Sequence, residues 1–152
     1  MATPLVRLAL LSATFAGGIA VGRTVQPPAP AASEPAPARV FELRTYTATP
    51  GRLPALQARF RAHTLGLFAR HGMTNIGYWT PRDSASRDSA GAATTLVYLL
   101  AHPSREAAAR SWAAFGQDPE WRRVRAASEA NGPIVARVES VFLDPTDYSP
   151  LR

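Results

Sequence analysis

The chain has 152 residues, with 17 basic side chains that are all Arg, 11 acidic ones and a formal net charge of +6. This length suits one domain of ordinary size, and the absence of Cys excludes disulfides, Cys-based metal sites, thiol nucleophiles and a lipoprotein anchor. The Arg residues are spread along the chain and no nucleic-acid-binding motif accompanies them, so the sequence predicts no nucleic-acid partner.

Residues 1–22 have the pattern of a secretory signal peptide or a signal anchor. Arg7 precedes an uncharged run of 15 residues from Leu8 to Gly22. As a helix this run would reach roughly 22 Å, less than the roughly 30 Å hydrocarbon core of a bilayer. Small residues from Ala20 to Gly22 fit a cleavage site. We therefore expect export to the periplasm or secretion, with an uncleaved membrane tether as one alternative and a mitochondrial presequence as another.

Residues 23–38 form a segment rich in Pro and Ala. After Val25 the segment has no large apolar side chain, so it lacks what a packed core needs. Repeated Pro favours extended, polyproline-like chain. We therefore expect a disordered spacer at 23–38 and a folded domain at 39–152.

The first half of this domain predicts a strand, a helix and a second strand. Residues 40–47 alternate between two faces, as a half-buried strand does. Apolar side chains recur at helical spacing from 53 to 68, and Gly72 ends that helix. Residues 73–81 form the second strand. The polar, turn-rich residues 82–92 then predict an exposed loop.

The second half predicts a central strand, a helix in two pieces and a last strand. Residues 94–102 are apolar on both faces, which is typical of a central strand. Ser104 can cap a helix, and residues 134–143 form the fourth strand. The inward side chains of that helix are Ala108, Trp112 and Phe115. The order β-α-β-β-α-β predicts an α+β, ferredoxin-like sandwich, with the strand order 4-1-3-2 by fold analogy.

The stretch AFGQDPEWRRV, residues 114–124, marks where the second piece of that helix begins. Asp118 is a suitable N-cap, Pro119 is tolerated at the first helical position, and Glu120 suits the helix dipole. We expect Trp121 and Val124 to face inward. The side chains expected to face solvent are Arg122, Arg123 and Arg125. The stretch therefore indicates a helix start rather than a catalytic loop.

Three segments of the domain resemble the NIPSNAP family. They are VFELRTYTATPGRLPAL at 40–56, AFGQDPEWRRV at 114–124 and VESVFLDPTDYSPLR at 138–152. In this order and at these distances, they extend the resemblance over the whole domain. The resemblance implies a dimeric α/β barrel, in which the sheets of two ferredoxin-like chains face each other. It implies no settled enzymatic activity.

The first and last predicted strands carry charges that suggest a dimer interface or a lined cavity. If the helices cover the side of Phe41 and Leu43, the open face carries Glu42, Arg44 and Tyr46. Paired charges among large apolar residues suit an interface better than water. We expect cross-strand ion pairs on this face, and we assign binding roles to Glu42, Arg44, Tyr46, Arg137 and Glu139.

Candidates for catalysis are few, and the two retained are His63 and Tyr78. His63 lies on the apolar side of the first helix, where it could face the cleft between helix and sheet, although a lone His there is more often structural. His71 and His102 end a helix and a strand. These His residues lack metal-ligand spacing, and the sequence has no Gly-rich phosphate loop and no Gly-x-Ser-x-Gly elbow. We therefore expect no metal and no cofactor.

Two classes of function remain open. The first is a homodimeric binding or interaction module, acting through its surface or its tail at 144–152. The second is a cofactor-free small-molecule enzyme, like a monooxygenase or an isomerase, with an apolar substrate between sheet and helices. In the second class His63 would be the general base and Arg44 the anion anchor, while Tyr46 and Tyr78 would donate hydrogen bonds.

Overall fold

The computed structural model describes residues 39–151; the predicted signal segment and spacer lie outside the described residues. The strands form a single antiparallel sheet in the order β2-β3-β1-β4. Their bounds are β1 Val40–Ala48, β2 Thr74–Trp79, β3 Thr95–His102 and β4 Val135–Leu143. This confirms the α+β, ferredoxin-like fold and the predicted strand order 4-1-3-2.

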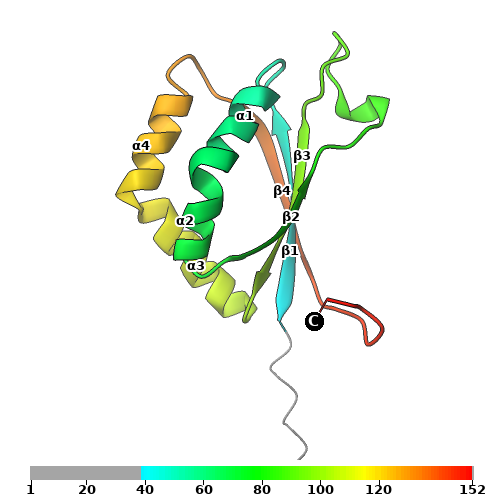
Figure 1. The fold of residues 1–152 in the computed structure, drawn as a ribbon, viewed down its shortest axis with the longest axis vertical. Coiled ribbons are helices and arrows are strands. Elements are labelled where there is room, and N and C mark those ends of the chain that lie inside the picture. Colours follow the sequence, from blue (N-terminus) through cyan, green and yellow to red (C-terminus); the bar gives the residue numbers. More distant parts are fainter. Residues whose placement is uncertain (1–38, 152) are drawn as a thin grey trace, which may run out of the picture. The chain divides into compact units, whose positions relative to one another are not determined.

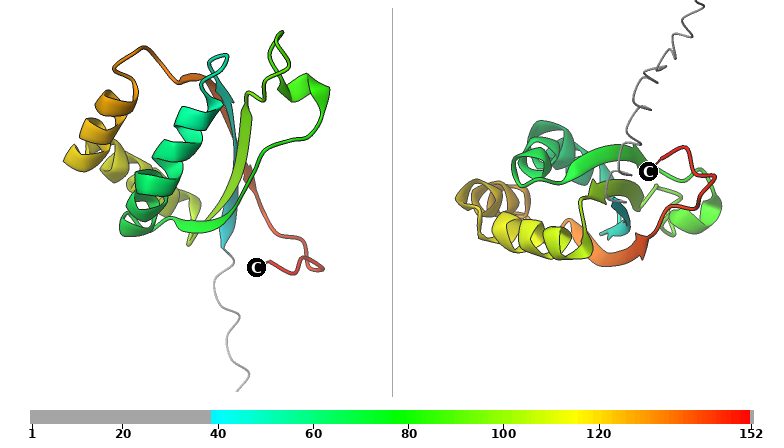
Figure 2. Two further views of the ribbon diagram at one scale, coloured as in Figure 1. Left: turned by 45° about the horizontal axis from the view of Figure 1, so that its top comes forward. Right: turned by 90° about the horizontal axis from the view of Figure 1, so that it is seen from below.

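All the long helices lie on one face of the sheet (Figures 1 and 2). They are α1 (Leu53–Arg59), α2 (Leu65–Arg70), α3 (Arg105–Gln117) and α4 (Pro119–Ser128), and a short 3-10 turn, Ser84–Ser86, lies in the predicted loop. The core between helices and sheet is aromatic. Its fully buried members include Phe68 and Tyr98, whose ring centroids lie 5.9 Å apart. Among the described residues, no helix combines the length and the apolar character that crossing a bilayer requires.

A π-helix, η1 (Phe60–Thr64), joins α1 to α2. Its wider turn is closed by the backbone N–H of Leu65, which donates to the carbonyl oxygen of Phe60. Thr64 is buried, and its hydroxyl donates to the carbonyl oxygen of Arg59 at 3.3 Å. The sequence pattern predicts one continuous helix here, and the π-turn is an addition that it does not reveal. Such turns occur often at functional sites.

The predicted helix starts are confirmed at both pieces of the second helix. The Ser104 hydroxyl accepts a hydrogen bond from the N–H of Ala107 at 3.1 Å. The Asp118 carboxylate accepts from the N–H groups of Glu120 and Trp121 at 2.7 and 3.2 Å. Trp121 packs on the ring of Phe115, with centroids 4.5 Å apart. The segment 114–124 is therefore a helix junction.

The prediction for the two faces of β1 is wrong. Glu42, Arg44 and Tyr46 point toward the helices, not away from them. Glu42 is 1% exposed and accepts a hydrogen bond from the indole N–H of Trp112 on α3, and the Tyr46 ring meets that of Phe60 on the π-helix. A buried carboxylate is tolerated when donors surround it. Those donors come from β3, α3 and β4, which the pattern of β1 alone does not show.

The opposite face of the sheet is largely apolar, and no described helix covers it (Figure 1). Leu43 of β1 lies between Leu99 of β3 and Val141 of β4. Val141 is 55% exposed. At one end the segment after β4 lies over Phe41, which is thereby buried. This surface, the open face, is defined by Leu43, Thr45, Trp79, Val97, Leu99, Arg137, Glu139, Val141 and Leu143.

Candidate functional site

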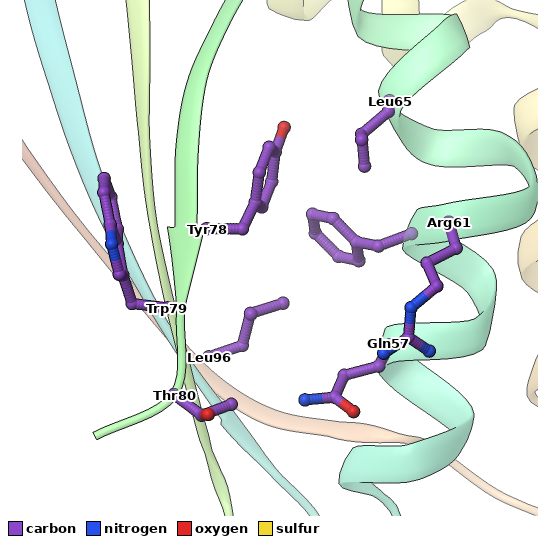
Figure 3. Close-up of a pocket in the computed structure, with 8 residues that line it drawn as sticks. Gln57, Arg61, Leu65, Tyr78, Trp79, Thr80 and Leu96 are labelled. Atoms are coloured by element: carbon purple, nitrogen blue, oxygen red, sulfur yellow. The ribbon is translucent and has the colours of Figure 1, made fainter. Parts of the chain in front are cut away.

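A cavity of about 290 Å³ lies between the first helix and the β2 edge of the sheet (Figure 3). Side chains of α1, η1 and α2 supply one wall, and strands β2 and β3 with the residue after β2 supply the other. This volume is near the lower end of the range for small-molecule sites. The residues that line it are Gln57, Phe60, Arg61, Leu65, Tyr78, Trp79, Thr80 and Leu96.

The interior of this cavity is apolar and one end is polar. Tyr78, Leu65 and Leu96 point toward the space between helix and strand, whereas Trp79 points away to the other side of β2 (Figure 3). Gln57 and Arg61, one helical turn apart, lie with polar ends toward the same opening (Figure 3). Among the described residues, none forms a hydrogen bond or an ion pair with the Arg61 guanidinium, which leaves it available to a ligand. The arrangement fits a small apolar molecule with one polar end.

Tyr78 is the titratable residue of this cavity apart from Arg61. Its hydroxyl donates to the side-chain oxygen of Asn75, and the Asn75 amide donates to the carbonyl oxygen of Leu65 at 3.1 Å. Burial raises the pKa of Tyr78 well above its usual range, and Tyr46 adds to the effect. Tyr78 therefore stays protonated at neutral pH. Its one proton is donated to Asn75, and Tyr78 cannot act as a base.

His63 does not share this cavity. It is half-buried and lies in a groove between the first helix and α4, together with Ala62 of η1 and Ala127 of α4. No strand residue lines that groove. The expectation that His63 faces the cleft between helix and sheet is therefore wrong, because the buried side of η1 is taken by Phe60 and Thr64. His63 and Tyr78 do not form a pair.

Glu42 is the centre of a buried polar cluster beneath α3. Its carboxylate bonds to Arg44 at 2.7 Å, Trp112 at 2.7 Å, Ser140 at 2.6 Å and His102 at 3.1 Å. Burial raises the pKa of Glu42, but these hydrogen bonds outweigh it and lower the pKa to about 2. None of these residues lines the cavity of Figure 3. Their hydrogen bonds join β1 to β3, β4 and α3, which indicates a structural role for the cluster.

Two further predictions concern the charged residues of β1 and β4. Arg44 pairs with Glu42 on the helix side, and Arg137 pairs with Glu139 on the open face. Each pair lies within one strand, so the predicted cross-strand ion pairs are wrong. The cause is the reversed face of β1, which places the two pairs on opposite sides of the sheet. The binding roles assigned to these four residues and to Tyr46 stay predictions.

The two remaining His residues hold structural positions. His71 at the end of α2 lies 2.7 Å from the Asp118 carboxylate, and hydrogen bonding to His71 and Arg70 holds the pKa of Asp118 well below its usual range. His102 is fully buried against Glu42. Within residues 39–151, no group of three His, Cys, Asp or Glu side chains is placed to hold a metal ion.

The interpretation of the sequence missed most of the cavity. The sequence pattern points to Tyr78, but not to Gln57, Arg61 or Leu96. One signal was available, since Gln57 and Arg61 are four residues apart and therefore lie on the same side of a helix. The π-turn that shapes this wall has no equivalent signal. The site thus depends on a local backbone feature that periodicity does not predict.

Comparisons with known proteins point to one family. The family model described as NIPSNAP matches residues 41–150. A NIPSNAP-like domain protein from Burkholderia xenovorans is 21% identical with a TM-score of 0.62, and the match covers 75% of this chain and 90% of that one. A NIPSNAP family protein of unknown function from Agrobacterium tumefaciens is 21% identical with a TM-score of 0.61. This match covers 76% of this chain and 96% of that one.

A second structure from Burkholderia xenovorans, an uncharacterized NIPSNAP domain protein, is 23% identical with a TM-score of 0.59. The match covers 73% of this chain and 98% of that chain. Within this chain the described residues belong to one compact unit, so residues 39–152 are a suitable fragment for experiments on the domain. No protein with a curated description matches the chain.

Proposed function

Because the chain belongs to the NIPSNAP family, we propose that it is a homodimeric binding module. The observation that carries the proposal is the open face. An apolar sheet surface with Val141 55% and Leu143 41% exposed is poorly suited to water. A second copy is the occupant that the fold class favours, since dimeric α/β barrels place two such faces together.

The charges on this face also favour a second copy. Arg137 and Glu139 are neighbours on β4, both more than half exposed. Under two-fold symmetry the same patch meets itself. Opposite charges side by side on one strand can therefore pair with their equivalents in the other copy, whereas a face of one charge sign would repel itself.

The oligomeric state of residues 39–152 tests the proposal. We expect a dimer by light scattering after size exclusion and by native mass spectrometry. Val141→Glu, which adds a charge to the centre of the open face, is expected to give a monomer. Val138→Glu is the matched control, because Val138 is 43% exposed on the same strand but pairs with Tyr46 on the other side. A monomeric wild type, or equal effects of the two variants, contradicts the proposal.

A cofactor-free small-molecule enzyme is the second candidate, and the cavity in Figure 3 favours it. Arg61 could stabilise an oxyanion there, whereas Tyr78 could donate to it only by giving up its hydrogen bond to Asn75. The lining includes no side chain that accepts a proton at neutral pH, and general acid–base catalysis needs one. Binding of a small apolar molecule is therefore the better supported use of the cavity.

Native mass spectrometry of residues 39–152 distinguishes these uses. We expect a discrete small-molecule adduct that Tyr78→Phe or Leu96→Trp removes, because both change the cavity lining. His63→Ala should leave the adduct in place, since His63 lies in another groove. If His63→Ala were the only variant to lose the adduct, His63 would be part of the binding site, and the result would favour the proposal of an enzyme.

The proposal includes export or tethering through residues 1–22. It rests on the uncharged run after Arg7, which lies outside the described residues. Expression of the full chain with a readout of the intact mass of the mature protein tests it. The mass of a chain that begins near Gly22 indicates cleavage. The mass of the full-length chain, found in the membrane fraction, indicates an anchor. The full-length mass in the soluble fraction contradicts both.

A further inference from the structure

We propose that a second pocket, between α4 and the β4 edge of the sheet, binds a small aromatic carboxylate through Arg59. The pocket has a volume of about 330 Å³. It shares no residue with the cavity of Figure 3. The residues that line it are Tyr46, Arg59, Trp121, Arg125, Glu129, Pro133, Val135, Ala136, Arg137 and Val138. The proposal stands independently of the dimer.

The main evidence is the incomplete hydrogen bonding of Arg59. The residue is 5% exposed, and a guanidinium carries five N–H donors. Its Nη1 donates to the Ser128 hydroxyl and to the Glu129 carboxylate, both at 3.1 Å. Nε is buried without a partner among the described residues, and no described residue forms a hydrogen bond with Nη2. A buried guanidinium with donors left over is costly unless another acceptor arrives.

The free groups of Arg59 indicate what that acceptor is. Nε and Nη2 form one edge of the guanidinium, and this edge binds a carboxylate through two parallel hydrogen bonds. The Arg59 guanidinium is held against the Trp121 ring, with its carbon 5.1 Å from the ring centroid. Stacking fixes the plane of the guanidinium. Arg59 is thus pre-organised for a planar anion.

The charge balance of the pocket also favours an anion. Glu129 is the acidic residue in the lining, and it pairs with both Arg59 and Arg125. Arg137 also belongs to the lining, but its charge is balanced by its partner Glu139. The single carboxylate of Glu129 therefore faces two guanidinium groups. A ligand carboxylate would reduce this excess, and the bare pocket attracts anions.

The remaining lining suits an aromatic body. Tyr46 and Trp121 contribute rings, and Val135 and Val138 contribute aliphatic groups from β4. The register of β4 shifts opposite the step from Thr47 to Ala48, and such bulges redirect side chains near sites. The modest volume limits the ligand to about the size of a substituted benzoate.

Titration of residues 39–152 with benzoate, and with benzamide as its uncharged analogue, tests the proposal. The readouts are calorimetry and the indole N–H resonance of Trp121. We expect benzoate to bind saturably and to shift this resonance, and benzamide to do neither. Arg59→Gln should weaken benzoate binding about tenfold, because it removes charge-assisted hydrogen bonds.

Variants at the pocket rim keep the test valid if Arg59→Gln fails to fold. Arg125→Gln, at a side chain 63% exposed, should weaken binding about threefold. Arg123→Gln is the matched control, since Arg123 lies on the same helix but not in this pocket. Tyr78→Phe should also have no effect. Absence of saturable binding, equal binding of benzamide, equal effects of the two helix variants, or loss of binding in Tyr78→Phe overturns the proposal.

Discussion

Two Arg–Glu pairs of the same spacing lie on opposite faces of the sheet. Glu42 and Arg44 of β1 are 2% and 16% exposed and pair at 2.7 Å beneath the helices. Glu139 and Arg137 of β4 are 51% and 66% exposed and pair on the open face. The chemistry and the separation along the strand are the same, so the surroundings decide what each pair contributes.

Hydrogen-bond donors, rather than apolar content, decide which face of β1 is buried. Three groups besides Arg44 bond to Glu42, and they come from Trp112, Ser140 and His102. Within residues 39–151, Glu139 has no such donors besides its partner Arg137. A charged residue can therefore occupy the core where its partners are complete, and the more apolar side of the same strand is left for the open face.

Glu42→Ala is expected to have the largest effect in this comparison. It leaves Arg44 without its carboxylate and leaves the Trp112 indole N–H without an acceptor. Removing one member of a buried ion pair costs about 3 to 5 kcal/mol. The measurement is urea unfolding at a fixed protein concentration, because a dimer has a concentration-dependent stability.

Glu139→Ala is the control for this substitution. Both substitutions are compared in the Val141→Glu background, where the open face has no second copy and Glu139 stays exposed. There the loss of this carboxylate should change the free energy of unfolding by about 0.5 kcal/mol or less. If the two variants destabilise the protein equally, the buried cluster contributes no more than the surface pair does.

Acid should remove part of the stability that Glu42 provides. Its pKa is about 2 in the folded chain, against an ordinary value of 4.5. Because the folded pKa is the lower one, the stabilisation is complete above pH 4.5 and is lost as the pH falls toward 2. The difference between these two pKa values corresponds to about 3 kcal/mol.

The measurement is the free energy of unfolding of the wild type and of Glu42→Gln, followed from pH 6 to about pH 2.5. Other carboxylates, Asp118 among them, titrate in both proteins. The wild type should therefore lose more stability than the variant over this range. Parallel curves for the two proteins would show that Glu42 has an ordinary pKa in the folded chain.

Trp112→Phe should have an intermediate effect. It keeps a ring against Phe68 but removes the indole N–H that donates to Glu42 at 2.7 Å. A hydrogen bond to a charged group contributes about 1.5 to 3 kcal/mol. Urea unfolding gives the loss, and Trp121→Phe is the control, since no described residue accepts a hydrogen bond from its indole. A loss in Trp112→Phe no larger than in Trp121→Phe contradicts the role assigned to this contact.

The fold can be predicted from the sequence because the features that indicate each helix and strand lie close together in the chain. The caps at Ser104 and Asp118 and the helical spacing from Leu53 to Phe68 depend on neighbours in the chain, and the structure confirms them. The faces of β1 depend on residues up to 98 positions away, as Ser140 is from Glu42. A single strand with large side chains on both sides carries no local signal for that choice.

The sites were harder to predict than the fold for the same reason. Two residues that line the cavity of Figure 3, Phe60 and Arg61, belong to the π-turn at 60–64. The side that His63 faces follows from the packing of η1 against α4. Arg59 gave no signal, because an Arg within a helix is usually exposed. Its burial follows from contacts with Trp121 and Glu129, which lie in a different helix and just after it.

The smallest expected effect is the coupling between Arg137 and Glu139. Both side chains are exposed in the single chain, and exposed pairs contribute about 0.2 to 1 kcal/mol. A double-mutant cycle with Arg137→Ala and Glu139→Ala measures the coupling. We expect the low end of that range in the Val141→Glu background, where the open face is free. In the wild type a second copy would bury the pair, and the coupling should rise.

The same small coupling in both backgrounds would show that the pair stays in water, and would count against a second copy on this part of the open face.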